Sequence, residues 1–245
     1  MARQPKVKHS HVFAGQRVTP EEREQYLIEI FRRLAPNYDR LLDVQSLGLH
    51  RYWRRVVVRE IAPRSGQHIL DVAGGCGEMA KRLDSPDRQV IVLDASIPMI
   101  NAGRTRSITN IEWVAGLAQA LPFPDASMDT VVCAFGIRNV TYVEEALREI
   151  LRVLKPGARF FCLEVSLPWA PILPLFRAYC RYIVPRVGTW VTRAPEAYEY
   201  LVDSILEFPD RTGIKDLFEE MGFTNVRCRR LTLGIACMHV GTKPC

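Results

Sequence analysis

Residues 69–78 read ILDVAGGCGE, and this segment constrains the fold more than any other part of the chain. An apolar run leads through Asp71 into a loop with three glycines, and a helical pattern follows from Met79. Glycine allows a sharp turn and a close approach of the backbone to a bound molecule. Such a loop between a buried strand and a helix is where α/β proteins hold nucleotide-like ligands. A second apolar run, 90–93, ends in Asp94, whose carboxylate can accept hydrogen bonds from both hydroxyls of an adenosine ribose. The pair of acids predicts a cofactor that contains adenosine.

The composition is that of an ordinary globular protein of 245 residues, with 48% hydrophobic and 24% charged residues. No stretch approaches the roughly 18 apolar residues that a membrane span needs. Seven cysteines without a C-x-x-C pair indicate free thiols in a reducing compartment, so we expect a cytoplasmic protein. The basic first twenty residues lack the apolar core of a secretion signal, and an organelle presequence is the less favoured alternative to a flexible arm. The net charge of +6 predicts only weak attraction to anionic surfaces.

One domain is expected over residues 1–245. It is divided into a flexible basic arm (1–20), an N-terminal helical cover (21–62) and an α/β core (63–243) with a helical insertion near 166–206. Thr19 and Pro20, followed by two acids, predict a helix start. Further helices are expected at 26–34, 38–48, 51–61, 77–84, 96–106, 141–153 and 210–221. Strands are expected at 67–73, 88–94, 111–115, 128–135, 158–165, 224–231 and 234–241.

Near-continuous apolar strands such as 90–93 and 130–135 indicate a mostly parallel sheet that is covered on both faces. Alternation of strands and helices predicts a doubly wound α/β fold. The last two strands are joined too tightly for a crossover helix, so one must run antiparallel to its neighbour.

The glycine loop itself permits three interpretations. Residues 75–80 satisfy G-x-G-x-x-A, a variant of the dinucleotide fingerprint. However, Asp71 would repel a pyrophosphate and attract an ammonium group, and the closing hairpin is not expected of a dinucleotide domain. S-adenosylmethionine carries an ammonium, a sulfonium and no phosphate, and we favour it over a nicotinamide dinucleotide. A tight turn without a ligand is the third alternative.

Longer strings then resemble a known family. They are NYDRLLDVQSLGLHRYW (37–53), ILDVAGGCGE (69–78), ALPFPDASMD (120–129), FGIRNV (135–140), RVLKPGARFFCLEVS (152–166), YEYLVDSI (198–205) and FPD (208–210). In this order they are similar to the ubiquinone/menaquinone biosynthesis C-methyltransferases, over roughly residues 25–243. The resemblance implies a Rossmann-like, seven-stranded class I methyltransferase sheet and S-adenosylmethionine as cofactor. It also implies methylation of a ring carbon on a polyprenylated benzoquinol or demethylmenaquinol.

Departures from the family pattern cluster around the expected ligands. The family usually has threonine at Cys76, an asparagine-alanine pair at Leu117-Ala118 and a small hydroxyl residue at Ala134, which implies altered hydrogen bonding around the adenine. On the substrate side, Leu41-Leu42 stand where methionine-asparagine is preferred, and Arg193-Ala194 stand where asparagine-aspartate is usual. A paralogue that methylates another hydrophobic small molecule is therefore an alternative. A non-catalytic cofactor-binding scaffold subunit of a quinone-biosynthesis assembly is another.

The site predictions follow from the loop and the resemblance together. Cofactor-binding residues are expected to be Asp71, Ala73, Gly74, Gly75, Cys76, Gly77, Asp94, Ala95, Met99, Leu117, Ala118 and Ala134. Arg138, Asn139 and Tyr38 are the expected catalytic residues, with Arg138 stabilising a phenolate or polarising a water because arginine stays protonated. The alternative for Arg138 is a salt bridge that closes a loop. His50 is a less favoured base, Asp129 is interpreted as structural, and no metal is expected.

Residues 165–195 contain four arginines, several aromatic residues and no acid. An amphipathic segment of this kind can lie on an anionic membrane surface and admit a lipid tail, and it can also form a dimer or a lid. The segment therefore predicts peripheral contact with the inner membrane or a homodimer, and the resemblance implies a lipophilic quinol as the substrate. Arg51, Arg54, Arg55 and Arg59 at helical spacing predict a solvated basic face. Nucleic-acid binding is not expected, because no basic run alternates with stacking aromatics.

Overall fold

The computed structural model describes residues 12–13, 16–106, 110–186, 204 and 208–245. Seven strands in this part of the chain form one sheet in the order β5-β4-β3-β6-β7-β9-β8. Their bounds are β3 His68–Val72, β4 Gln89–Asp94, β5 Glu112–Ala115, β6 Met128–Ala134, β7 Leu154–Val165, β8 Thr224–Leu231 and β9 Ala236–Thr242. Two short segments, β1 Val12–Phe13 and β2 Gln16–Arg17, pair separately.

The predicted mixed sheet is confirmed. Strands β3 to β7 are parallel, and β9 runs antiparallel to both β7 and β8. The connection between β8 and β9 is a single turn, η4 (Thr232–Gly234), which is too short to return the chain for a parallel pairing. The strand order reverses between β3 and β6, and the crevice at such a switch point is where open α/β sheets bind ligands.

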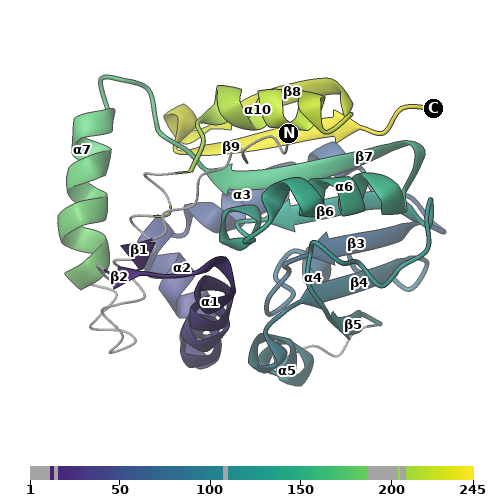
Figure 1. Ribbon diagram of the computed structural model, residues 1–245, viewed down its shortest axis with the longest axis horizontal. Helices are drawn as coiled ribbons and strands as arrows, with labels where there is room; N and C mark the ends of the chain where they lie inside the picture. Colours follow the sequence, from purple (N-terminus) through teal and green to yellow (C-terminus); the bar gives the residue numbers. More distant parts are fainter. Residues whose placement is uncertain (1–11, 14–15, 107–109, 187–203, 205–207) are drawn as a thin grey trace.

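Helices cover both faces of the sheet (Figure 1). On one face, α6 (Val143–Val153) and α10 (Arg211–Glu220) pack on β6 and β7 around a core with Phe160 and Phe218 stacked at 5.2 Å. On the other face, α3 (Leu49–Ile61) and α4 (Ala80–Leu83) bury a second core against the same strands. The helix α5 (Ile97–Arg106) follows β4 and contacts the edge strand β5. Burial on both sides explains why these strands are apolar along their whole length.

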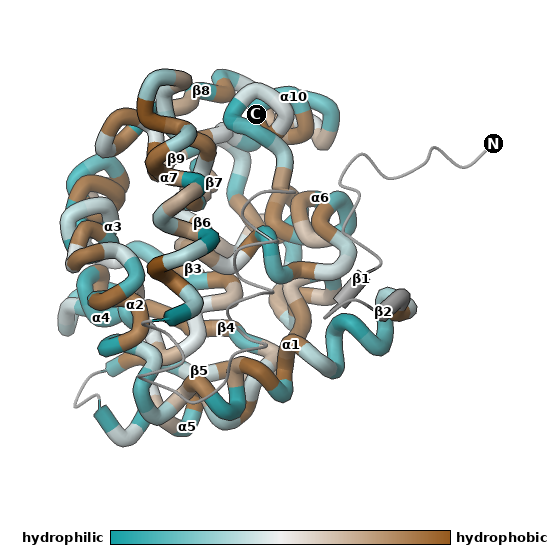
Figure 2. The backbone as a smooth tube through the Cα atoms, turned by 90° about the vertical axis from the view of Figure 1, so that its left-hand side faces the viewer, coloured by the Kyte–Doolittle hydropathy of each residue, from teal (hydrophilic) through white to brown (hydrophobic). Residues whose placement is uncertain are grey.

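A third group of helices gathers at the end of the sheet where β3, β4 and β6 finish (Figure 1). They are α1 (Pro20–Leu34), η1 (Ala35–Asn37), α2 (Tyr38–Ser46), α7 (Leu173–Ala178) and the π-helical turn η3 (Tyr179–Ile183). Thr19 and Glu22 form the reciprocal capping box that begins α1. Figure 2 views the molecule from this end, with hydrophobic strands between α3 on one side and α6 on the other. None of the described helices is long and apolar enough to cross a membrane.

Some predicted boundaries are wrong. The helix expected at 77–84 covers only Ala80–Leu83, because the glycine loop continues in turns as far as Met79. The helix expected at 38–48 ends at Ser46, where Leu47 and Gly48 take left-handed conformations. Strand β7 begins at Leu154 rather than 158.

The prediction that the arginines of α3 form a solvated face is wrong for Arg54. Arg54 is 3% exposed, although Arg51 and Arg55 are exposed. The part of the insertion at 187–203 and 205–207, which includes Arg193-Ala194, lies outside the described residues, as does most of the basic arm.

Candidate active site

The glycine loop after β3 is shaped by steric contacts that only glycine tolerates. A Cβ at Gly74 would lie 2.8 Å from the carboxyl carbon of Asp71. Gly77 has a φ of +73°, and a Cβ there would lie 2.6 Å from the ring of Trp113. Gly77 therefore packs against the edge of the sheet, whereas the rest of the loop borders an open cavity.

Asp94, at the end of β4, holds this loop in place. One carboxylate oxygen accepts a hydrogen bond from the Gly75 N–H at 2.8 Å, and the other accepts one from the Ser96 N–H at 2.8 Å. A carboxylate has about four lone-pair sites, so both oxygens can accept further hydrogen bonds from a ligand. Its partial burial raises the pKa of Asp94.

Asp71, on the neighbouring strand β3, is buried and only half satisfied. Its Oδ2 accepts a hydrogen bond from the Ala80 N–H at 3.1 Å, while Oδ1 has no hydrogen-bond partner among the described residues. Burial raises the pKa of Asp71 to about 7, because water no longer stabilises the charged form. A buried carboxylate oxygen without a partner is costly, and a cationic ligand would remove this cost.

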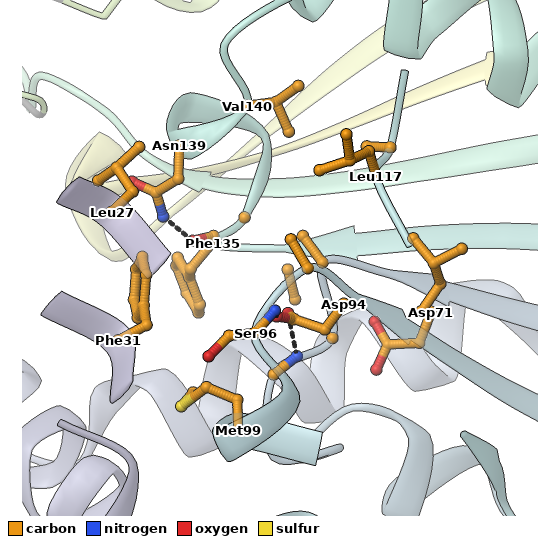
Figure 3. Close-up of a pocket in the computed structure, with 18 of the residues that line it drawn as sticks. Leu27, Phe31, Asp71, Asp94, Ser96, Met99, Leu117, Phe135, Asn139 and Val140 are labelled. Atoms are coloured by element: carbon orange, nitrogen blue, oxygen red, sulfur yellow. Dashed lines mark hydrogen bonds between the residues drawn. The ribbon is translucent and has the colours of Figure 1, made fainter. Parts of the chain in front are cut away.

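The predicted cofactor-binding residues come together at one cavity (Figure 3). Eleven of the twelve line it, and Gly77 does not. Asp71 and Asp94 reach it from adjacent strand ends, and Phe31 lies across from them on α1 (Figure 3). The pattern of α1 predicted a helix but did not indicate that Leu27 and Phe31 would close this cavity.

A second, larger cavity of about 590 Å³ lies beside the first. Its walls come from α1, α2, α3, α7 and η3, and they are mainly apolar. The two cavities share Phe31, Tyr38, Phe135 and Asn139 among their lining residues. An apolar ligand in the larger cavity would therefore lie against the same side chains as a ligand in the smaller one.

Arg138 and Asn139 lie in a short turn, η2 (Ile137–Asn139), directly after β6. The Arg138 guanidinium is buried and forms an ion pair with Glu164 of β7 at 2.6 Å. It also donates a hydrogen bond to the Phe135 carbonyl at 3.2 Å. Arg138 lines only the apolar cavity, whereas Asn139 lines both. The ion pair closes the turn, as the alternative interpretation of Arg138 expected, and its catalytic role stays a prediction.

Tyr38, the third expected catalytic residue, lies where the two cavities meet. Tyr38 lines both cavities, and loss of contact with water raises the pKa of its hydroxyl to about 12. Its neighbour Asp39 forms an ion pair with Arg106 of α5 at 2.9 Å.

Asp129 is remote from the cavities and structural. It accepts hydrogen bonds from the His68 N–H at 2.9 Å and from Lys155 at 2.7 Å, which ties β6 to its two neighbours.

The fold and this site define a class I methyltransferase. A Thermotoga maritima S-adenosylmethionine-dependent methyltransferase superposes with a TM-score of 0.62 at 20% identity, covering 88% of this chain and 99% of that chain. A Haloferax volcanii methyltransferase, solved with the Trm112 methyltransferase activator, gives 0.62 at 18% identity, covering 88% and 98%. A Haemonchus contortus N-methyltransferase in complex with S-adenosylhomocysteine gives 0.58 at 15% identity, covering 78% and 52%. These likenesses establish the fold.

Residues 19–243 match the model of the ubiE/COQ5 methyltransferase family, and the chain belongs to this family. A relative from Rubrivivax gelatinosus is 46% identical over 96% of this chain and 93% of its own length. Another, from Zymomonas mobilis, is 39% identical over 92% and 96%. Both are named ubiquinone/menaquinone biosynthesis C-methyltransferase UbiE.

The protein is thus an S-adenosylmethionine-dependent methyltransferase, as the sequence predicted. The cavity suits this cofactor, because the buried Oδ1 of Asp71, which has no hydrogen-bond partner among the described residues, would attract an ammonium group and repel a phosphate. The dinucleotide interpretation of the loop is wrong.

Proposed function

We propose that this enzyme transfers a methyl group from S-adenosylmethionine to a ring carbon of a prenylated benzoquinol or of a demethylmenaquinol-type naphthoquinol. The observation that carries the proposal is the shared wall of the two cavities. An acceptor with a long apolar tail would fill the larger cavity and place its ring at Tyr38 and Asn139, beside the cofactor. The names of the relatives support the same substrate class.

The smaller cavity would hold the cofactor by both acids. Asp94 would accept hydrogen bonds from the ribose hydroxyls, and the free Oδ1 of Asp71 would bind the ammonium group. Leu117, Ala118 and Met99 would flank the adenine. When bound, the cofactor supplies an electrophilic methyl group on its sulfonium. Holding the acceptor carbon within about 3–3.5 Å of that methyl supplies a large share of the catalysis.

The chain must also make the ring carbon nucleophilic. A quinol does this when it loses a hydroxyl proton, but phenols titrate near ~10, so the protein must favour the phenolate. We propose that Arg138 presents its positive charge to the acceptor oxygen from the wall of the apolar cavity, while a water takes the hydroxyl proton. After methyl transfer the ring carbon would lose its own proton to water, which restores the aromatic ring. Asn139 and the protonated hydroxyl of Tyr38 would orient that oxygen by hydrogen bonds.

A radiolabelled transfer assay tests the proposal. The enzyme, methyl-labelled cofactor and a short-chain demethylmenaquinol or 2-prenyl benzoquinol are incubated under reducing conditions, and the product is analysed by mass spectrometry. We expect the label on a ring carbon. Cofactor binding without transfer to either quinol would contradict the proposal. It would favour the scaffold subunit, whereas transfer to another hydrophobic acceptor would favour the paralogue.

We further propose that the mouth of the apolar cavity contacts a membrane, which places the enzyme peripherally at the inner membrane. Leu47, Leu175, Tyr182 and Ile183 line the cavity and are also 77%, 73%, 56% and 49% exposed. Exposed Arg177 and Arg181 accompany them. Exposed apolar side chains next to arginines favour an anionic bilayer, from which a lipid-tailed acceptor could enter.

Sedimentation with vesicles tests this contact. We expect binding to vesicles with anionic lipid, and weaker binding of a Leu47→Ser/Leu175→Ser variant. If the protein does not sediment and forms a dimer that the same variant disrupts, the face is a homodimer interface and the membrane proposal is wrong.

A further inference from the structure

Arg54 of α3 is a buried cation in the wall of the smaller cavity. Its side chain is 3% exposed, and its guanidinium lies 5.0 Å from the centre of the Phe135 ring. Among the described residues no carboxylate forms an ion pair with it, and its Nε has no hydrogen-bond partner. Glu78, another residue of the same wall, is paired instead with Arg82 at 2.9 Å.

The hydrogen bond that Arg54 makes does not neutralise it. Its Nη1 donates to Nδ1 of His50, so that nitrogen must be the acceptor and His50 carries its proton on Nε2. This Nε2–H donates to Asp43 at 2.8 Å, and Asp43 in turn binds Arg51. Burial lowers the pKa of His50, in agreement with a neutral ring. Asp43 and His50 therefore orient the Arg54 guanidinium without giving it a negative partner.

A buried guanidinium of this kind is expensive unless a ligand supplies the missing charge. Arginine stays protonated, and a buried charge without a counter-charge is strongly unfavourable. The same cavity also contains a buried acceptor of opposite charge, the Oδ1 of Asp71, which has no hydrogen-bond partner among the described residues. Burial is the largest cause and lowers the pKa of Arg54, while the charges of Tyr38, Glu78 and then Asp71 act in the opposite direction. No ion pair or hydrogen bond joins Arg54 to Glu78 or Asp71 among the described residues. A buried cation and a buried anion that face one cavity without contact match a zwitterion.

We propose that Arg54 binds the carboxylate of the amino-acid end of the cofactor, opposite the ammonium site at Asp71. The inference rests on the proposed placement of the cofactor and extends it by one side chain. His50 and Asp43 are then positioning residues, because they touch Arg54 and not the ligand. The apolar cavity that His50 lines would be connected to the cofactor through this hydrogen-bonded chain.

Two ligands that differ only in the carboxylate provide the test. One is S-adenosylhomocysteine, and the other is 5′-deoxy-5′-(3-aminopropylthio)adenosine, which lacks that group. With the intact enzyme we expect calorimetry to show about 10- to 100-fold tighter binding of the first, the value of charge-assisted hydrogen bonds. Arg54→Gln, which keeps a donor for His50, should reduce this ratio to near one by weakening only S-adenosylhomocysteine. Arg54→Lys should keep most of the ratio.

Arg55→Gln, at the exposed neighbouring position of α3, is the matched control and should leave both affinities unchanged. Equal affinities of the two ligands for the intact enzyme would overturn the inference, and this result needs no variant to fold. An equal loss of both ligands in Arg54→Gln would also overturn it, since it would indicate a structural role. Failure of the intact enzyme to bind either ligand would instead refute the proposed cofactor site.

Discussion

The two cavities of this enzyme differ in what builds them. The smaller one, about 110 Å³, is formed largely by consecutive strand ends and the loops that follow them, and its wall contains Asp71 and Asp94. The larger one, about 590 Å³, is formed by helices from the N-terminal cover and the insertion, and its wall is mainly apolar. One cavity is defined by a few hydrogen bonds to fixed backbone, the other by the packing of separate helices.

Because the two cavities are built differently, substitutions in one should affect a different ligand from substitutions in the other. A cofactor that every family member shares requires fixed polar groups, and a sheet edge supplies them with little freedom. A lipophilic acceptor requires volume and an entrance for its apolar tail, and helices from separate segments of the chain can enclose such a space. Substitutions in the small cavity should therefore act on cofactor binding and substitutions in the large one on the acceptor.

The largest expected effect concerns the ion pair between Arg138 and Glu164, in which both side chains are buried. Arg138→Met would leave the Glu164 carboxylate, 3% exposed, without its partner. We expect a loss of about 3–5 kcal/mol in the free energy of unfolding, measured by urea denaturation. Arg138→Met/Glu164→Gln should recover most of this loss, because no buried charge remains.

The double variant separates stability from catalysis. If Arg138 stabilises the phenolate, methyl transfer stays low in the double variant although the protein is stable again. Recovery of both stability and methyl transfer would show that the ion pair only closes the turn.

The next effect tests the small cavity. Asp94→Ala removes the ribose partner and frees the Gly75 and Ser96 N–H groups. We expect calorimetry to show a loss of at least about 100-fold in affinity for S-adenosylhomocysteine. Asp216→Ala, on the exposed side of α10, is the control and should bind normally. Unchanged affinity in Asp94→Ala would remove the ribose assignment.

The sequence predicted the small cavity well because its determinants are local. Asp71, the glycines and Asp94 lie within two strand–loop units, and parallel strands place their carboxyl ends together. The large cavity depends on contacts between distant segments, such as Tyr179 of η3 donating to the Gln45 carbonyl of α2 at 2.9 Å. No pattern within either segment indicates that contact.

Two residues show where sequence reasoning was incomplete. Glu164 lies within an apolar strand, and only the structure shows that it pairs with Arg138. The spacing of the arginines predicts a basic surface that includes Arg54, yet Arg54 lies four residues after His50 on the buried stripe that continues through Val57. That helical spacing was the available signal for its burial.

A third prediction concerns the opposing effects of Asp71 on stability and function. Its pKa of about 7 in the folded protein lies above the ordinary value of 3.8, so the folded state binds more protons between these values. Stability should therefore fall as the pH rises through this window. Asp71→Asn cannot ionise, and we expect it to be about 1–3 kcal/mol more stable than the unchanged protein at pH 8 and no more stable at pH 4.

Thermal unfolding at the two pH values measures this difference, and calorimetry at pH 8 provides the second readout. The same variant should bind S-adenosylhomocysteine more weakly, because the ammonium group loses its charged partner. A variant that gains no stability at pH 8 would show that Asp71 is not held at a raised pKa.

The smallest expected effect is confined to the large cavity. Leu42→Trp adds bulk to the wall that the acceptor tail would occupy. Overfilling such a space costs about 1–3 kcal/mol, so we expect roughly a tenfold rise in KM for the quinol in the transfer assay. The affinity for S-adenosylhomocysteine should not change, because Leu42 does not line the small cavity. Arg40→Trp, at an exposed position of the same helix, controls for added bulk outside the cavity. A loss of cofactor affinity in Leu42→Trp would show that the two cavities are coupled through α2 and would break the separation between them.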